Sequence, residues 1–301
     1  MTISETIHRF NNTITNKGYV PVLTGFKEID GLANGWKPGE LCVIGGRPAM
    51  GKTAFVLSII HNMALSNIPV ALFTAIDSPN LPFLSRVTCN LLNKEQYWKT
   101  DDNLKILSES DLTALPVHLY ADPKITMKFL RDTCKELVDK HGVKCIFIET
   151  IQALLASESD GLSKGSMEMA CIELKHLAIE LNVPIVITSD LNRGPEHRGG
   201  FVGKRPQLQD IRLSDAIENI ADSIWFILRP SYYRVFEDER GHDLRSKAII
   251  IVEKNKYGAT GDAYLTFNNA KCSFEGEKTT DIMNAEGVQA LMDALDLEPI
   301  E

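Results

Sequence analysis

The sequence predicts an α/β fold in which a mainly parallel sheet carries helices on both faces. Three observations lead to this prediction. A glycine-rich phosphate-binding motif follows a short apolar run, strand-like runs alternate with helical patterns, and the last strand-like runs follow one another closely. Strands separated by helices need crossover connections and pair in parallel, whereas closely spaced strands pair antiparallel. We therefore expect antiparallel strands to extend the sheet at its C-terminal end.

The expected elements follow in order along the chain. An amphipathic helix is predicted at residues 3–15, where apolar residues recur in steps of three and four. Turns at Asn34-Gly35 and Pro38-Gly39 precede the strand that begins at Leu41. Further strands are predicted at 69–75, 117–121, 144–149, 184–189, 222–229, 247–254 and 262–267. Helices are predicted at 53–65, 79–92, 126–140, 167–181 and, in the acidic tail, 285–295.

Composition restricts the functions that the chain can have. The 301 residues carry a net charge of −8, so any contact with nucleic acid requires a local basic patch. Six scattered cysteines without a C-x-x-C pair favour a reduced, cytoplasmic protein. The N-terminus has no apolar leader, and no run approaches the ~18 apolar residues that span a bilayer. We expect no membrane partner.

The strongest motif is a phosphate-binding loop within LCVIGGRPAMGKT, residues 41–53. The segment fills every fixed position of the pattern G-x-x-x-x-G-K-[ST]. Glycine lets backbone N–H groups approach phosphate oxygens, the lysine reaches the β- and γ-phosphates, and the hydroxyl binds Mg²⁺. The following helix directs its positive end at the anion. The predicted nucleotide-binding residues are Gly46, Arg47, Pro48, Ala49, Met50, Gly51, Lys52 and Thr53.

Hydrolysis at such a loop needs further polar groups nearby. Glu149 ends the apolar run KCIFIE and is the best candidate to hold the water shell of Mg²⁺; an exposed strand-terminal glutamate is the alternative. Gln152 either orients water and senses the γ-phosphate or is an ordinary loop residue. Asp77 is either the general base or a cap for the helix that Pro79 opens.

Two groups of cations complete the candidate residues. Lys254 and Lys256 lie in EKNKYGATG, where they either meet the γ-phosphate of a neighbouring subunit or belong to a solvated hairpin. The segment 192–212 is either a nucleic-acid contact or a solvated loop of mixed charge. Its cations are Arg193, Arg198, Lys204, Arg205 and Arg212.

Together the motifs resemble the RecA-type motor domain of DnaB-like replicative helicases. Six motifs carry the resemblance from about residue 24 to 274: TGFKEIDGL, GGRPAMGKT, FIETIQALL, LKHLAIELNVPIVITSDLNR, KRPQLQDIRLSDAIENIAD and IVEKNKYGATGDAYLTF. The resemblance implies a linker-type helix at 1–18, a RecA-like ATPase domain at 19–276 and an acidic tail at 277–301. No motif of the family's N-terminal helical domain is matched, and the sequence leaves open whether a separate chain supplies that domain.

The resemblance further implies an ATP-dependent DNA helicase that couples hydrolysis to translocation on single-stranded DNA as a homo-oligomeric ring, expected to be a hexamer. Lys52 and Thr53 would bind phosphate and Mg²⁺, Glu149 would take the acid position beside Mg²⁺, and Gln152 would sense the γ-phosphate. The loops at 157–166 and 192–212 would face the central channel. Lys254 and Lys256 would be the cations that contact the nucleotide of the neighbouring subunit. The implied DNA contacts are Arg193, Lys204, Arg205 and Arg212.

Several positions depart from the family's pattern. Glu149 stands where an aspartate is usual, and Ile76 stands where the catalytic glutamate is expected, with Asp77 one step along. Lys256 replaces an arginine and lacks its forked donors, and Asp215 adds negative charge to the presumed DNA loop. Losing a positioned base costs about 10²- to 10⁴-fold in rate. The alternative function is therefore a nucleotide-binding, ring-forming accessory protein with slow or lost hydrolysis; a recombinase-like or clock-type ATPase would share the fold but not this motif set.

Overall fold

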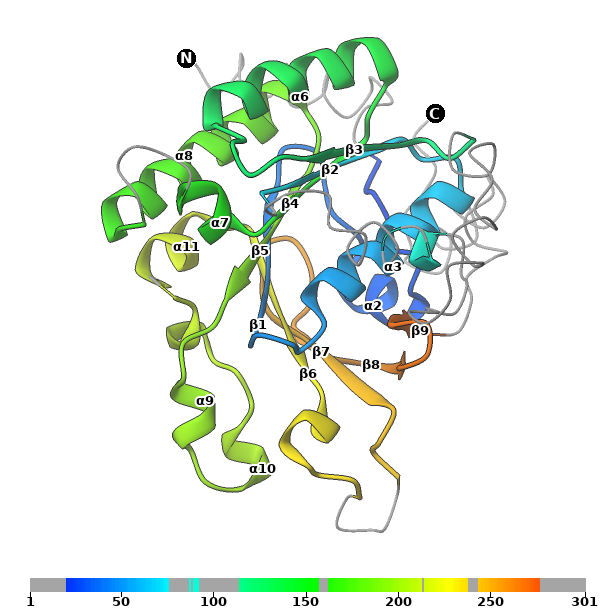
Figure 1. Cartoon of the computed structure of the whole chain (residues 1–301), viewed down its shortest axis with the longest axis vertical. Helices are drawn as coiled ribbons and strands as arrows, with labels where there is room; N and C mark the ends of the chain where they lie inside the picture. Colours follow the sequence, from blue (N-terminus) through cyan, green and yellow to red (C-terminus); the bar gives the residue numbers. More distant parts are fainter. Residues whose placement is uncertain are drawn as a thin grey trace, which may run out of the picture.

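The computed structural model describes residues 20–75, 87, 89–91, 114–156, 162–212, 214–237 and 243–276. They form a nine-stranded sheet of order β3-β2-β4-β5-β1-β6-β7-β8-β9 (Figure 1). The strands are β1 Leu41–Gly46, β2 Val70–Thr74, β3 Val117–Ala121, β4 Cys145–Glu149, β5 Ile185–Asp190, β6 Ser223–Leu228, β7 Lys247–Asn255, β8 Gly261–Asn268 and β9 Ser273–Glu275. The helices are α2 Lys27–Ala33, α3 Lys52–Leu65, α6 Met127–His141, α7 Ile151–Ala156, α8 Lys164–Leu181, α9 Gly194–His197, α10 Gly200–Gly203 and α11 Ser214–Ile220, with 3₁₀ helices η2 Leu208–Asp210 and η3 Pro230–Tyr233.

The pairing of the strands confirms the predicted fold class. β3, β2, β4, β5, β1 and β6 pair in parallel, and β7, β8 and β9 continue the sheet antiparallel. β1 lies between β5 and β6, with Gly46 opposite Asp190 and Cys42 opposite Ser223. Parallel strands end at the same edge of a sheet, so the carboxyl ends of β1, β4 and β5 lie together.

The alternation of side chains along each strand creates two cores. In β1, Cys42 and Ile44 pack into a cluster with α2 and α3, whereas Leu41 and Val43 pack into a second cluster with α6, α7 and α8. Helices therefore cover both faces (Figure 1). β1 is buried along its whole length, which holds the end of the strand in a fixed position.

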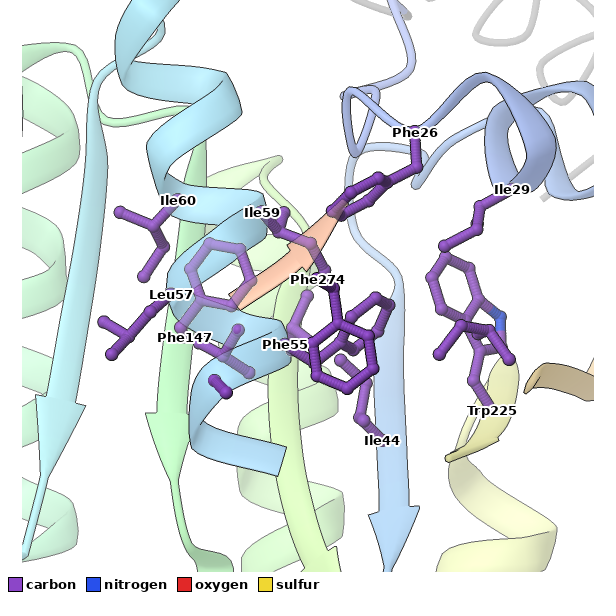
Figure 2. Close-up of a cluster of buried hydrophobic side chains, with 14 of the residues drawn as sticks. Phe26, Ile29, Ile44, Phe55, Leu57, Ile59, Ile60, Phe147, Trp225 and Phe274 are labelled. Carbon is purple, nitrogen blue, oxygen red and sulfur yellow. The ribbon is translucent and has the colours of Figure 1, made fainter. Parts of the chain in front are cut away.

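Aromatic rings dominate the core between the sheet and α3 (Figure 2). The ring of Phe55 from α3 contacts that of Phe274 from β9, with centroids 5.2 Å apart. Trp36 stacks on Trp225 of β6 at 4.9 Å. The Phe55–Phe274 contact fixes the start of α3 against β9, at the end of the described residues.

Some elements differ from the sequence prediction. α8 begins at Lys164, not 167, because Ser163 caps it: the Ser163 hydroxyl accepts from the Ser166 N–H at 3.0 Å. The predicted loops at 157–166 and 192–212 thus lose residues to helices, the second to α9, α10 and η2. α2, α7, α11 and β9 were not predicted. The helices predicted at 3–15 and 285–295 and most of that at 79–92 lie outside the described residues, as does the tail at 277–301.

The described helices include none that is both long enough and apolar enough to cross a bilayer.

Candidate functional site

The phosphate-binding loop joins the buried end of β1 to the first turn of α3. Gly51 is the N-cap of α3 and has φ +105°, a conformation that side chains oppose. A Cβ at Gly51 would lie 3.2 Å from the ring of Phe274, and one at Gly46 would lie 3.1 Å from Cγ of Lys52. Both glycines of the motif therefore meet a real geometric requirement, and the start of α3 directs backbone N–H groups into the loop.

The variable residues of the loop divide into a buried pair and an exposed pair. Pro48 and Ala49 are exposed, whereas Arg47 and Met50 are buried. Sδ of Met50 accepts a hydrogen bond from the N–H of Arg229 at 3.3 Å, so this side chain anchors the loop to the end of β6.

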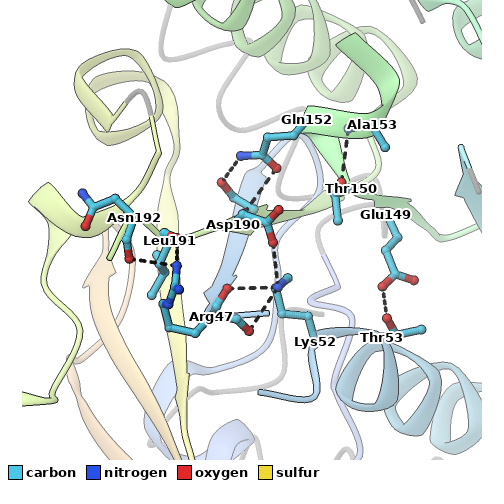
Figure 3. Close-up of polar contacts among 12 residues, drawn as sticks. Arg47, Lys52, Thr53, Glu149, Thr150, Gln152, Ala153, Asp190, Leu191 and Asn192 are labelled. Carbon is cyan, nitrogen blue, oxygen red and sulfur yellow. Dashed lines mark hydrogen bonds and ion pairs between the residues drawn. The ribbon is translucent and has the colours of Figure 1, made fainter. Parts of the chain in front are cut away.

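The Lys52 side chain is buried at the centre of the loop (Figure 3). Its Nζ donates to the carbonyl oxygens of Gly46 at 2.9 Å and Arg47 at 3.4 Å. The same Nζ is 2.8 Å from Oδ1 of Asp190, at the end of β5. The lysine thus lies where the motif needs a cation, and an acid is next to it.

A hydroxyl and a carboxylate meet on the other side of Lys52. The Thr53 hydroxyl donates to Oε1 of Glu149, at the end of β4 (Figure 3). Oxygen ligands of this kind suit Mg²⁺. Among the described residues, no group of three or more His, Cys, Asp or Glu side chains could hold a metal on its own. A metal at Thr53 and Glu149 would therefore take phosphate and water oxygens as its remaining ligands, which fits Mg²⁺ bound with a nucleotide.

Gln152 lies on the same edge of the sheet, in α7. Its Nε2 donates to Oγ of Ser189 at 2.8 Å, and its Oε1 accepts from the N–H of Asp190 at 3.2 Å. The amide is therefore held against the end of β5, beside the acid that contacts Lys52. Asp77, the other acid predicted for this edge, lies outside the described residues.

Two features of the site were not predicted. Asp190 ends the apolar run IVITSD just as Glu149 ends its own run, so the criterion that selected Glu149 would also have found Asp190. The second is an ion pair, in which Nε and Nη2 of Arg47 donate to Oε1 of Glu196 at 2.8 and 2.6 Å. These partners are 149 positions apart, and no local pattern indicates their contact.

Lys254 and Lys256 lie beside the amino ends of the parallel strands, whereas the loop lies at their carboxyl ends. Lys254 pairs with Ile224, near the start of β6, and Ile224 pairs with Val43 of β1. Val43 lies four residues, or about 13 Å, before Arg47 of the loop, which is beyond the reach of a lysine side chain. Nζ of Lys254 donates to the carbonyls of Glu218 and Ala221, both at 2.7 Å, and burial lowers its pKa. Nζ of Lys256 is 3.5 Å from the buried carboxylate of Asp222. Neither lysine can meet a nucleotide held by its own loop.

The segment 192–212 projects from the same edge as the loop (Figure 1), and several of its cations already have partners. Arg205 forms two hydrogen bonds of 2.6 Å with Asp262, which raises the pKa of the guanidinium. Nζ of Lys204 donates to two carbonyl oxygens of its own segment. Arg193 and Arg212 are exposed. Fewer cations of this segment are therefore available to a nucleic acid than its number of basic residues suggests.

Comparisons with known proteins agree with this architecture. The family model described as "DnaB-like helicase C terminal domain" matches residues 21–276. The chain is 31% identical over 263 residues to the replicative DNA helicase DnaB of Mycoplasma genitalium, covering 83% of this chain and 55% of that protein. It is 32% identical over 287 residues to a probable plasmid replicative DNA helicase of Chlamydia psittaci, covering 92% and 60%. The chain thus spans little more than half the length of these curated relatives.

Solved structures share the fold. One solved ATPase domain matches with a TM-score of 0.76 at 22% identity, covering 91% of this chain and 98% of that one. A DnaB-like replicative helicase, solved in a study of its interactions with primase, matches with a TM-score of 0.75 at 23% identity, covering 92% and 67%. These matches show that the nine-stranded sheet has the same fold as both solved structures.

Proposed function

The chain belongs to the DnaB-like helicase C-terminal domain family, and on that basis we propose that it is an ATP-driven motor that translocates on single-stranded DNA in the cytoplasm. The motor would act as a hexameric ring. The observation that carries this proposal is the grouping of Lys52, Thr53, Glu149 and Gln152 around a loop whose backbone is shaped for phosphate.

Each side chain of this group has a role in the proposed reaction. Lys52 would balance the charge of the β- and γ-phosphates, and Thr53 with Glu149 would hold Mg²⁺. The metal supplies further neutralisation of the phosphoryl oxygens. Gln152, fixed by Ser189 and the backbone of Asp190, would orient the attacking water. Asp77 is the proposed general base.

The remaining predicted residues act between subunits and on DNA. Lys254 and Lys256 would approach the nucleotide of a neighbouring subunit, because the sheet separates them from the loop of their own chain. The segment 192–212 would line the channel, and Arg193 and Arg212 are its exposed cations. Lys204 and Arg205 would contribute after exchanging their present partners for phosphate.

A second candidate is a ring-forming accessory protein that hydrolyses ATP slowly. The observation that favours it is the engagement of both proposed trans cations within their own chain. Lys254 donates to two carbonyls, and Lys256 lies 3.5 Å from Asp222. A cation with such partners is less available to a phosphate on a neighbouring subunit.

Steady-state ATP hydrolysis with and without single-stranded oligo(dT) separates the two candidates. The motor predicts DNA-stimulated turnover of at least about 1 s⁻¹, and Lys52→Ala abolishes it. Lys140→Ala is the matched control, because this lysine is 67% exposed and pairs with Glu136 of its own helix. ATP binding without DNA stimulation would reject the motor and leave the accessory protein. ATP turnover that survives in Lys52→Ala would reject both the motor and the accessory protein, because each places ATP at Lys52.

A further inference from the structure

The ammonium of Lys52 has an acceptor within the chain for each of its donors (Figure 3). The acceptors are the carbonyl oxygens of Gly46 at 2.9 Å and Arg47 at 3.4 Å, and Oδ1 of Asp190 at 2.8 Å. An ammonium carries three N–H donors. A phosphate oxygen that binds Lys52 must therefore replace one of these three partners.

Asp190 is the partner that phosphate would displace. The two carbonyls are neutral and belong to the backbone of the loop, so an anion beside them meets no net charge. Asp190 is a carboxylate on a side chain that is 34% exposed, so water can reach it. Two anions at one ammonium repel each other, so the phosphate weakens the contact of Lys52 with the partly exposed carboxylate.

We propose that Asp190 is a nucleotide-responsive positioning residue: its carboxylate holds Lys52 until a nucleotide phosphate takes its place. This inference rests on the proposed binding of ATP to the loop. Asp190 ends β5 and lies two residues before the start of the segment 192–212. Its displacement therefore releases the start of that segment from one contact with the phosphate-binding loop.

A second contact keeps the segment attached. Nη1 of Arg47 donates to the carbonyls of Leu191 at 2.6 Å and Asn192 at 3.1 Å, and the guanidinium also pairs with Glu196. Arg47 is buried, and its guanidinium contacts Leu191, Asn192 and Glu196. The loop thus grips residues 190–196 through two cations, and a nucleotide competes for only one of them. The contacts of Arg47 would stay in place when a nucleotide binds, and the contact between Lys52 and Asp190 would be released.

Removing the charge of Asp190 tests the competition. Asp190→Asn should bind ATP with Mg²⁺ roughly fivefold more tightly than the unaltered chain in calorimetry, because phosphate no longer displaces a carboxylate. Asp190→Ser should give the same direction and guards against a folding defect specific to the first variant. The matched control is Asp262→Asn, which removes an aspartate paired with Arg205 in the same segment but distant from Lys52. Its ATP affinity should not change.

Hydrogen exchange at the amides of residues 190–197 provides a readout that is independent of turnover. In the unaltered chain, ATP should accelerate exchange there. In Asp190→Asn, exchange without ATP should already be faster than in the unaltered chain, and ATP should add little. Circular dichroism of each variant verifies that the fold is intact.

The outcomes separate this inference from the proposed function. Tighter ATP binding by both Asp190 variants, together with the altered exchange, would support the competition. ATP affinity that is unchanged or weaker in both variants, or exchange at 190–197 that responds to ATP as in the unaltered chain, would overturn it while leaving ATP binding intact. Failure of the unaltered chain to bind ATP would instead reject the proposed function.

Discussion

At the scale of single residues, the loop depends on a glycine in a backbone conformation that would be strained for any other residue. Gly51 has φ +105°, and a Cβ there would meet the ring of Phe274 at 3.2 Å. We expect Gly51→Ala to lower the free energy of unfolding by about 1–3 kcal/mol, measured by urea denaturation. Gly31→Ala is the control, because Gly31 lies within α2 with open space around it. It should be neutral or stabilise by up to about 1 kcal/mol. Equal losses in both variants would contradict the argument.

A buried acid makes the stability depend on pH. Asp30 accepts hydrogen bonds from the N–H and hydroxyl of Thr24 and from the N–H of Gly25, but burial raises its pKa to about 6. The unfolded pKa is near 3.8. Between these values the native chain binds more protons than the unfolded chain, so stability falls as the pH rises.

The expected loss attributable to Asp30 is roughly 2.4 kcal/mol between about pH 4 and pH 7. Urea denaturation across this range, compared with Asp30→Asn, checks it. The variant is expected to be less stable throughout, because an amide cannot accept all three hydrogen bonds, but its curve should lack this descent. Parallel curves for the two proteins would show that the carboxyl group does not titrate in this range.

At the scale of elements, β9 packs against α3 and holds this helix in place on the sheet. Phe274 is buried, its ring centroid lies 5.2 Å from that of Phe55, and its N–H donates to Oγ of Ser58 at 3.0 Å. Phe274→Ala should cost about 3–5 kcal/mol in the free energy of unfolding, because it leaves a cavity between strand and helix. Leu65→Ala, at a position 65% exposed on the same helix, should change stability by less than about 0.5 kcal/mol. A small loss for Phe274→Ala would mean that β9 contributes little to the core.

Local patterns explain which elements could be predicted. The strands at 117–121 and 145–149 are predictable because each is a short run of mostly apolar residues, and this signal needs no knowledge of their neighbours. The strand predicted to end at 189 stops one residue short of Asp190, since a polar residue at the end of an apolar run resembles the start of a loop. That single residue is the one that contacts Lys52.

Contacts distant in sequence explain what could not be predicted. The segment 192–212 is rich in glycine and charge, which predicts a loop, yet ion pairs from Arg198 to Asp210 and from Arg205 to Asp262 hold it in a folded form. Composition shows that charges are present but not which of them are paired. Pairing depends on the strand order, which places β5 beside β1 and thus Glu196 beside Arg47.

At the scale of the whole molecule, the sheet separates the two halves of the proposed ATP site. The loop lies at the carboxyl edge of the parallel strands, and Lys254 and Lys256 lie at the amino edge. One chain cannot bring both halves to one nucleotide. A head-to-tail ring can, because each heterologous interface joins the carboxyl edge of one subunit to a different surface of the next.

Mixing two inactive variants tests this arrangement. Lys52→Ala lacks the loop lysine but keeps Lys256, and Lys256→Ala keeps the loop lysine but lacks the trans cation. If the cation acts in trans, each variant alone should be inactive, but random co-assembly should leave about a quarter of the interfaces with both groups intact. ATP turnover should therefore reappear on mixing. Lys52→Ala mixed with Thr53→Ala is the control, because both changes fall in the loop and no interface regains a complete site. Mixed rings that form, as verified by native mass spectrometry, but remain inactive would show that Lys256 does not act on the neighbouring nucleotide.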